Sequence, residues 1–386
     1  MLKAFTLSCR LLLKALVQIP APEPRSLGRP GPKRMATLFF FVPAFILIQA
    51  IHWTGFLLDE LFFRNYRKVR IDGPVFITGV PRSGTTLLHR TLSHDKRFTT
   101  FLTWELLFGL SITARKIIKG LAVVDRFAGS PLKRLLKTVE KKQTACFNQV
   151  HHTSLFQPEE DYLSLCPVMA CFILVLPFPR LDLLWKMAYF DKSMPFKEEQ
   201  TILAFYKSCL KKHIYFHGES KRLLSKNASF SGAITSLAET FPDARIICCT
   251  RNPAEAVPSA LSSIQSGIKM FGLDHQDSIF KQRIVETMKE YYQNIERVAV
   301  SLPPEKCALV DISRISGNLE DTVRNLYQRL GLDLDTDFEQ ELKLAHKQSR
   351  CYQSAHNYSL EKFGIEAEDI RKELRPYWEK SRQEEI

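Results

Sequence analysis

Residues 76–89 decide the fold, and they read Phe76-Ile77-Thr78-Gly79-Val80-Pro81-Arg82-Ser83-Gly84-Thr85-Thr86-Leu87-Leu88-His89. An apolar strand leads into a glycine turn, and the turn leads into the start of a helix. Gly79 and Gly84 occupy the two glycine positions of the phosphate loop G-x-x-x-x-G-K-[ST]. Backbone N–H groups at such a turn and at the following helix N-terminus bind a phosphate-like anion. The stretch therefore predicts an anion-binding loop in an α/β protein.

The loop lacks the lysine that nucleotide hydrolases place after the second glycine. Thr85 stands at that position, and a cation comes earlier, at Arg82. Because that lysine reaches the β- and γ-phosphates of ATP or GTP, its absence argues against their chemistry. A nucleotide-dependent small-molecule kinase on the same scaffold is kept as the alternative function. A non-catalytic membrane protein that retains only the fold is a third class, since fold does not imply function.

Strand and helix patterns alternate along the rest of the chain. Strand patterns cover residues 75–78, 222–225, 245–250 and 308–312, and helical patterns cover residues 85–93, 104–140, 197–217, 232–241, 279–300 and 319–330. Such alternation predicts a P-loop-like, doubly wound parallel sheet flanked by helices, with ligands at the carboxyl ends of the strands. We expect this α/β domain over residues 71–386, after a basic N-terminal segment over residues 1–70.

Four blocks of the sequence, in order, resemble the sulfotransferase superfamily, whose donor is 3′-phosphoadenosine-5′-phosphosulfate (PAPS). Residues 81–86 are similar to its 5′-phosphosulfate loop, and residues 223–226 are similar to the strand that ends in its central lysine. Residues 245–259 resemble its 3′-phosphate site, where a strand delivers an arginine and the next helix delivers a serine eight residues later. Residues 356–364 are similar to a C-terminal signature of bacterial-type members. The arginine in the loop also matches the bacterial-type and tyrosylprotein branches.

The resemblance implies that the protein transfers a sulfuryl group from PAPS to a hydroxyl or amine acceptor by in-line displacement, and it implies a role for each matching residue. The residues that would bind the 5′-phosphosulfate are Arg82, Ser83, Gly84, Thr85 and Thr86. Lys226 would stabilise charge on the sulfonate or on the leaving oxygen, and Arg251 and Ser259 would hold the 3′-phosphate. PAPS is a co-substrate that brings its own activated sulfonate, so we expect no metal, and the sequence contains no H-E-x-x-H spacing.

Glu105 is our assignment for the general base that accepts the proton of the acceptor. It follows Trp104, in the segment where tyrosylprotein and some carbohydrate sulfotransferases place a catalytic glutamate. A first-turn acid that interacts with the helix dipole is the other interpretation of Glu105. The alternative bases are His151, His152 and Glu160.

Composition restricts the classes of partner. The chain has 386 residues and a formal net charge of +13, which suits nucleic acid, an anionic membrane or anionic ligands. We expect no nucleic-acid partner, because zinc-finger spacing and RNA-binding aromatic signatures are absent from the sequence. Nine cysteines form no C-x-x-C pair, which argues against a zinc site. The acceptor stays open among a glycan, a lipid, a peptide and a small alcohol, and so does the oligomeric state.

Residues 36–58 form an uncharged, apolar run inside the basic N-terminal segment. Crossing a bilayer takes roughly 20 such residues, so the run is long enough. Pro43, Gln49 and His52 interrupt it and weaken the case for a span. We expect a membrane-associated helix of unassigned orientation. The alternatives are a helix that lies in the membrane surface and a helix that packs on the domain of a cytoplasmic protein.

Overall fold

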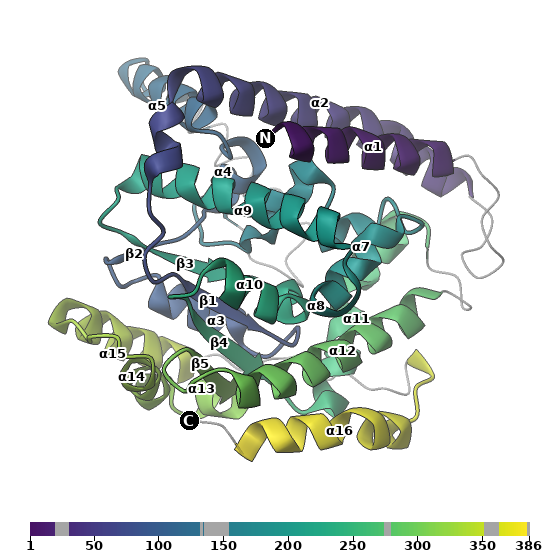
Figure 1. Ribbon diagram of the computed structural model, residues 1–386, viewed down its shortest axis with the longest axis vertical. Helices are drawn as coiled ribbons and strands as arrows, with labels where there is room; N and C mark the ends of the chain where they lie inside the picture. Colours follow the sequence, from purple (N-terminus) through teal and green to yellow (C-terminus); the bar gives the residue numbers. More distant parts are fainter. Residues whose placement is uncertain (20–30, 132–133, 135–153, 274–278, 351–362, 384–386) are drawn as a thin grey trace.

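A five-stranded parallel sheet lies at the centre of the fold (Figure 1). The computed structural model describes residues 1–19, 31–131, 134, 154–273, 279–350 and 363–383. Its strands are β1 (Val75–Gly79), β2 (Phe98–Thr99), β3 (Arg222–Lys226), β4 (Arg245–Thr250) and β5 (Cys307–Asp311). They are arranged in the order β2-β3-β1-β4-β5, and every neighbouring pair is parallel. The predicted doubly wound parallel sheet is confirmed.

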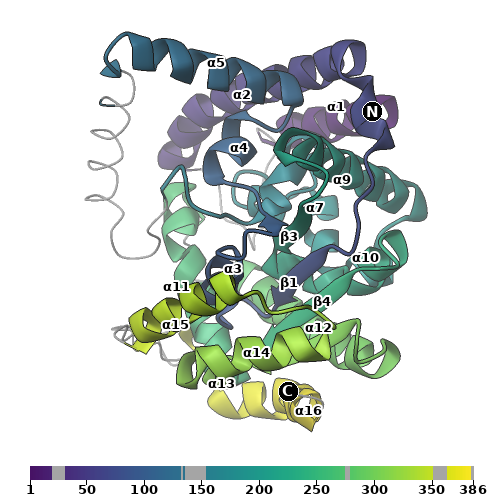
Figure 2. The same cartoon turned by 90° about the vertical axis from the view of Figure 1, so that its left-hand side faces the viewer.

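Helices surround the sheet and extend to both ends of the molecule (Figures 1 and 2). The α-helices are α1 (Leu2–Gln18), α2 (Pro32–Phe62), α3 (Thr85–Leu92), α4 (Thr103–Phe108), α5 (Ile112–Phe127), α7 (Asp182–Lys186), α8 (Phe190–Ser193), α9 (Phe196–His217), α10 (Ile234–Thr240), α11 (Pro253–Met270), α12 (Ile279–Ser301), α13 (Ile312–Gly317), α14 (Leu319–Arg329), α15 (Thr336–Arg350) and α16 (Ala367–Gln383). The 3-10 helices are η2 (Arg64–Lys68), η3 (Asp161–Val168), η4 (Phe172–Val175), η5 (Met187–Tyr189) and η6 (Ala228–Gly232).

Both faces of the sheet are buried. Phe76 of β1 and Ile246 of β4 belong to a core shared with α9 and α12, whereas the next residues, Ile77 and Ile247, belong to a core shared with α3 and α14. Successive side chains of a strand point to opposite faces, so each strand contributes to both cores. This explains why the strands read as continuous apolar runs, which is typical of parallel sheets covered on both sides.

The strand order reverses at β1, whose neighbours are β3 on one side and β4 on the other. Ligands of doubly wound sheets bind beyond the carboxyl ends of the strands at such a reversal. The register places Ile77 opposite Lys226 and Gly79 opposite Cys249. The loop after β1, the end of β3 and the residues after β4 therefore share one edge of the sheet.

The N-terminal helices form a layer at one end of the molecule, where α1 and α2 lie together with α5, and α4 and α9 separate them from the sheet (Figures 1 and 2). The ring centroids of Phe5 in α1 and Trp53 in α2 are 5.0 Å apart. Buried residues of both helices, among them Leu7 and Phe56, belong to the same core as Phe76. Within the described residues, α2 is the one helix long and apolar enough to cross a membrane. The domain boundary at residue 70 stays a prediction.

Two local features differ from the expectations. The helical pattern over residues 104–140 is interrupted, because the Ser111 side chain accepts a hydrogen bond from the Ala114 N–H and starts α5 as a separate helix. The remainder of that pattern lies largely outside the described residues. Strand β2 was not predicted. It has two residues and exists through its pairing with β3, so it leaves no period-two pattern in the sequence.

Candidate active site

The anion-binding loop begins where β1 is tied to its neighbours. The Gly79 N–H donates to Ser231 Oγ at 2.9 Å, and the Val80 N–H donates to the Cys249 carbonyl at 3.0 Å. Gly79 has φ +140°, and a Cβ there would lie 2.1 Å from the Cys249 carbonyl oxygen. Only glycine fits this position, because a side chain would clash with the backbone of β4. The first glycine of the motif thus fixes where the loop leaves the sheet.

The loop then turns its backbone into the start of α3. Ser83 Oγ donates to the Val80 carbonyl at 2.7 Å and closes the turn. Gly84 has φ +84° and directly precedes α3, which begins with Thr85 and Thr86. Gly84 is the N-cap residue, and as a glycine it has no side chain to cap the helix. The first N–H groups of α3 are therefore left for an anion. Arg82 itself has φ +70°, a left-handed conformation that is uncommon outside glycine and clusters at functional sites.

Arg82, Ser259 and Arg251 come together although they are distant in the sequence. Arg82 Nε donates to Ser259 Oγ at 3.1 Å, and Arg251 Nη1 donates to the Arg82 carbonyl at 3.1 Å. Tyr292 Oη donates to the Arg251 carbonyl at 2.5 Å and holds the turn after β4. Arg251 also contacts Glu255 at 2.9 Å through Nη2. Two arginines and a buried serine thus adjoin the loop and can bind a polyanion.

Lys226 ends β3 and forms an ion pair with Glu160. The lysine side chain is 4% exposed and the glutamate side chain is 25% exposed, so the carboxylate lies at the boundary with solvent. Glu160 is held on its own strand-like segment, where the Glu159 N–H donates to the Phe101 carbonyl at 3.0 Å. A cation that is nearly buried requires a partner, and Glu160 supplies it. The ion pair places the ammonium group of Lys226 and the carboxylate of Glu160 at the carboxyl edge of the sheet.

His89 of α3 is a second titratable group beside Lys226. Its Nε2 is 2.7 Å from Thr100 Oγ1. Burial, with the nearby charges of Lys226 and Arg90, lowers the pKa of His89 to about 3. The imidazole is therefore neutral at physiological pH and contributes no positive charge to this edge.

Asp161, the residue after Glu160, is buried, and one of its two carboxyl oxygens has a hydrogen-bond partner. Tyr206 Oη is 2.6 Å from Asp161 Oδ2 and 3.2 Å from Ser225 Oγ. Within the described residues no partner meets Oδ1. Burial raises the pKa of Asp161 to about 7, against the opposing hydrogen bond from Tyr206. The folded protein therefore holds a proton on this carboxyl more tightly than the unfolded chain does.

We expect Asp161→Asn to stabilise the protein relative to the native chain increasingly as pH rises from about 4 to about 7. The stability that the buried neutral acid gives is complete below the ordinary pKa of 3.8, and it is lost as pH rises through about 7. Asparagine does not ionise, so the difference in the free energy of unfolding grows over that window, to at most about 4 kcal/mol. Urea titrations at several pH values measure it. A difference that does not change with pH contradicts the prediction.

Glu105 lies in a buried network at the N-terminus of α4, where it is part of the cap of that helix. Its carboxylate accepts hydrogen bonds from His217 Nε2 at 2.7 Å and from the Leu102 N–H at 3.0 Å, and Arg115 Nη1 is 3.7 Å away. Burial raises the pKa of Glu105, but the hydrogen bond from His217 and the charge of Arg115 outweigh it, so the pKa lies below its ordinary value. The side chain is 0% exposed. A base that must meet an acceptor needs an accessible oxygen, and neither oxygen of Glu105 is free.

Glu105, His213 and His217 are close enough together to be tested as a metal site, since their ligand atoms lie within 4.8 Å of one another. His213 Nδ1 faces Arg115 Nη1 at 3.1 Å, and His213 Nε2 is 2.9 Å from Thr99 Oγ1. Both nitrogens of His213 are thus engaged, and the guanidinium cation occupies the side where an ion would bind. This network stabilises the packing of α4 and α9 and does not fit a metal.

The comparison with known families decides the class of protein. A profile of the sulfotransferase family matches residues 74–337, which is well over half of the chain. The chain belongs to the sulfotransferase family. The resemblance to sulfotransferases is confirmed, and three of its four sequence blocks lie inside the matched range. The fourth block, residues 356–364, lies beyond that range, and its residues 356–362 are outside the described residues.

Related sulfotransferases share the sequence and the fold. The omega-hydroxy-beta-dihydromenaquinone-9 sulfotransferase Stf3 of Mycobacterium bovis and that of Mycobacterium tuberculosis are each 26% identical over 280 residues. The match covers 72% of this chain and 66% of the relative, just under two thirds of its length. The sulfotransferase STF1 of M. tuberculosis H37Rv aligns with 97% of this chain and 92% of its own, at TM-score 0.68 and 18% identity. STF9 of Mycobacterium avium aligns with 84% and 80%, at TM-score 0.66 and 17% identity. These two structures show the sulfotransferase fold.

Magnesium-nucleotide chemistry needs a carboxylate that can hold the metal. Among the described strands, β5 is the one that ends in a carboxylate, Asp311. Its Oδ1 accepts from the Ser313 N–H at 2.9 Å, and its Oδ2 accepts from Trp378 Nε1 at 3.2 Å. Asp311 thus caps α13 and anchors α16. Together with Thr85 in place of the lysine, this disfavours the kinase alternative.

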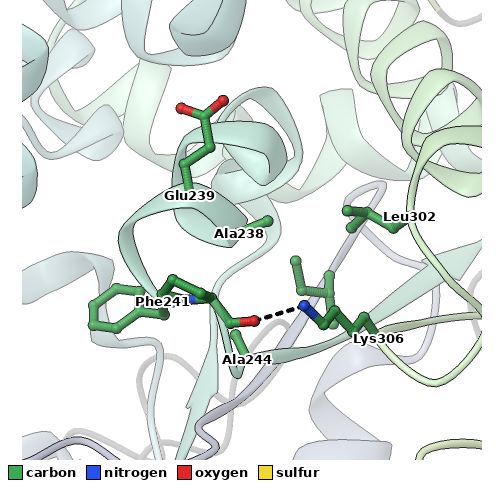
Figure 3. Close-up of a pocket in the computed structure, with 8 residues that line it drawn as sticks. Ala238, Glu239, Phe241, Ala244, Leu302 and Lys306 are labelled. Atoms are coloured by element: carbon green, nitrogen blue, oxygen red, sulfur yellow. Dashed lines mark hydrogen bonds between the residues drawn. The ribbon is translucent and has the colours of Figure 1, made fainter.

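A pocket of about 150 Å³ lies at the other edge of the sheet (Figure 3). Its lining includes Ala244 and Lys306, which immediately precede β4 and β5, and Lys306 Nζ donates to the Pro242 carbonyl at 2.8 Å. Because the strands are parallel, all their amino ends lie at this edge and the anion-binding loop lies at the opposite one. The pocket is separate from the sulfotransferase site.

Two residues that support the site, Ser231 and Tyr292, could not be predicted from the sequence. Ser231 of η6 accepts a hydrogen bond from the Gly79 N–H, and Tyr292 of α12 donates one to the Arg251 carbonyl. Neither belongs to a motif, since their roles depend on which elements meet in space. His151 and His152, two of the alternative bases, lie outside the described residues.

Proposed function

We propose that this protein transfers a sulfuryl group from PAPS to a hydroxyl acceptor. The observation that carries the proposal is the juxtaposition, at one edge of the sheet, of the loop with Arg82, the Arg251–Ser259 pair and the Lys226–Glu160 ion pair. The first two sets suit the 5′-phosphosulfate and the 3′-phosphate of the donor. The ion pair suits the chemistry between donor and acceptor.

Residues of the anion-binding loop bind the 5′-phosphosulfate of the donor. The side chain of Arg82 forms one hydrogen bond within the described residues, through Nε, which leaves its terminal nitrogens for sulfonate or phosphate oxygens. The first N–H groups of α3 bind the same anion, and Ser83, Gly84, Thr85 and Thr86 shape and open that helix. Arg251 and Ser259 distinguish the 3′-phosphate from ordinary adenine nucleotides.

Glu160 acts as general base and Lys226 as electrostatic stabiliser. The acceptor oxygen forms a bond to sulfur while the bond from sulfur to the bridging phosphate oxygen breaks, and 3′-phosphoadenosine-5′-phosphate (PAP) leaves. Glu160 takes the hydroxyl proton, and Lys226 balances the charge that develops on the leaving oxygen. Glu160 replaces Glu105 in this role because its carboxylate is accessible and pairs with Lys226, whereas Glu105 is fully buried. No step requires a metal.

The acceptor we propose is a membrane lipid that carries a hydroxyl group, and we propose that the protein is membrane-associated. The relatives named for a hydroxylated menaquinone act on such a molecule. In this chain, Gln49 of the apolar helix α2 donates to the Cys166 carbonyl at 3.0 Å, in the helix η3 that begins directly after Glu160. The apolar helix therefore contacts the segment that carries the proposed base. Transfer to a glycan, peptide or small alcohol with no activity on lipid would contradict this choice.

Calorimetric titration with PAP, adenosine 5′-phosphosulfate and ATP–magnesium tests the donor assignment. We expect PAP to bind best, and we expect Arg251→Ala to weaken PAP binding about 10- to 100-fold while it leaves adenosine 5′-phosphosulfate binding little changed. Arg324→Ala is the control, since Arg324 pairs with Glu320 and Glu339 on α14 and α15. Equal affinity for PAP and adenosine 5′-phosphosulfate would contradict the assignment of PAPS as the donor, and preference for ATP–magnesium would favour a kinase.

A further inference from the structure

The helix α2 buries polar as well as apolar residues against the protein and is apolar toward solvent. Its buried residues include Arg34, Gln49, His52 and Asp59, which are at most 5% exposed. Its outer side exposes large apolar residues, among them Phe39 (73%), Phe40 (74%) and Leu47 (62%). A surface helix in water instead exposes polar residues to solvent and turns its apolar stripe toward the protein core. The outer side of α2 therefore suits an apolar medium.

The two neighbouring helices continue this apolar surface. α1 exposes Leu2, Leu13 and Val17, and α5 exposes Leu121, Val124 and Phe127, each at 56% or more. The three helices lie together at one end of the molecule in both views (Figures 1 and 2). We call their exposed sides the N-terminal face. An apolar surface of this extent marks an interaction site.

The exposed charges of the N-terminal face are basic. Lys3 and Lys14 on α1, Lys33 on α2, and Lys116 and Lys119 on α5 are exposed. The acids of these three helices are Asp59, Glu60 and Asp125: Asp59 and Asp125 are buried, and Glu60 pairs with Arg67. Lysine and arginine around an apolar helix surface are typical of binding to anionic lipid.

The protein-facing contacts of α2 hold it against the domain from end to end. Arg34 donates to the Phe271 carbonyl near the start of the helix, at 3.3 Å. Near its end, Asp59 accepts from Lys212 Nζ at 2.7 Å and from the N–H groups of Ile112 and Thr113 at 3.0 and 2.8 Å. A helix that crossed a bilayer would lose these contacts and would expose a buried ion pair to lipid.

We propose that the N-terminal face docks onto an anionic lipid bilayer, with α2 lying in the plane of the membrane surface and not spanning it. The inference deepens the membrane association proposed above. Lipid surrounds the outer side of α2, and the catalytic domain stays on one side of the bilayer. Ser8 of α1 donates to the Pro167 carbonyl at 2.6 Å, so α1 as well as α2 holds η3, the segment that follows Glu160. Docking thus brings the bilayer surface next to the elements that support the proposed base.

Vesicle flotation of the full chain tests the surface. We expect binding to phosphatidylcholine vesicles that contain phosphatidylglycerol, with weaker binding to phosphatidylcholine alone. The double variant Phe39→Glu/Phe40→Glu is expected to lose roughly tenfold or more of the bound fraction. Val300→Glu is the matched control, because Val300 is 79% exposed on α12, in the half of the molecule away from α2. Equal loss in both variants, or a stable dimer in light scattering without vesicle binding, would overturn the proposal.

Labelling of the two ends of α2 tests its orientation. In a Cys9→Ser background, Lys33→Cys and Asn65→Cys, both at exposed polar positions near the two ends of α2, are each made by cell-free synthesis with sealed vesicles and treated with a membrane-impermeant maleimide. In-plane docking predicts that both react from outside, above the background of the parent variant. Reaction at one end only would show a span and overturn the inference. PAP binding, measured on the same proteins, is expected to be unchanged, so failure of docking and failure of the donor assignment are separate results.

Discussion

Replacing Glu160 by glutamine is expected to lower kcat about 10²- to 10⁴-fold, the usual contribution of a general base. Glutamine keeps the shape of the side chain but cannot take the proton of the acceptor hydroxyl. PAP affinity should stay within a few-fold of the native value, because the donor is held by the loop and by Arg251 and Ser259. The decisive measurements are steady-state kinetics with a saturating donor and calorimetry with PAP.

Two further variants distinguish the loss of the general base from the loss of a nearby charge or of stability. Glu159→Gln changes the adjacent carboxylate, whose Oε1 accepts from the Glu160 N–H at 2.9 Å, and it should retain most of kcat. Glu105→Gln removes a fully buried partner of Arg115 and His217, so it should chiefly lower the free energy of unfolding, by about 3 kcal/mol or more. If Glu105→Gln abolished transfer in a protein of native stability while Glu160→Gln remained active, the base would be Glu105.

Replacing Gly79 by alanine is expected to lower the free energy of unfolding by about 3 kcal/mol or more and to abolish PAP binding. The new Cβ would lie 2.1 Å from the Cys249 carbonyl oxygen and 2.6 Å from its nitrogen, both of them backbone atoms of β4. Neither atom can move without breaking the β1–β4 pairing, and φ +140° is itself strained for alanine. Urea denaturation measures the stability, and calorimetry measures the binding.

Gly120→Ala provides the matched control for that substitution. Gly120 lies inside α5, and a Cβ there would meet no atom within 4 Å. Alanine is the better helix former, so this variant should gain about 0.5–1 kcal/mol. A Gly79→Ala protein as stable as the native one would mean that the loop leaves β1 differently from the path described.

The sequence by itself predicted the fold and the candidate donor-binding residues. Residues 76–89 predict the strand, turn and helix that the structure contains, because a glycine turn between an apolar strand and a helix has few other solutions. The apolar runs of β4 and β5 predict a parallel sheet covered on both faces, and the two buried cores, one on each face, confirm it. The resemblance to sulfotransferases indicated Arg82, Lys226, Arg251 and Ser259 as candidate site residues, and the fold gathers them because the carboxyl ends of parallel strands meet at one edge.

Tertiary structure decided which carboxylate can act and which way α2 faces. Glu105 lies in the first turn of α4, and Glu160 directly precedes η3. Packing buries Glu105 against Arg115 and pairs Glu160 with Lys226. The apolar run over residues 36–58 meets the length of a membrane span. The contacts of Arg34, Gln49 and Asp59 with distant parts of the chain hold that helix on the domain. Burial and long-range contacts depend on neighbours that the local sequence does not specify, and these properties therefore appear only in the folded chain.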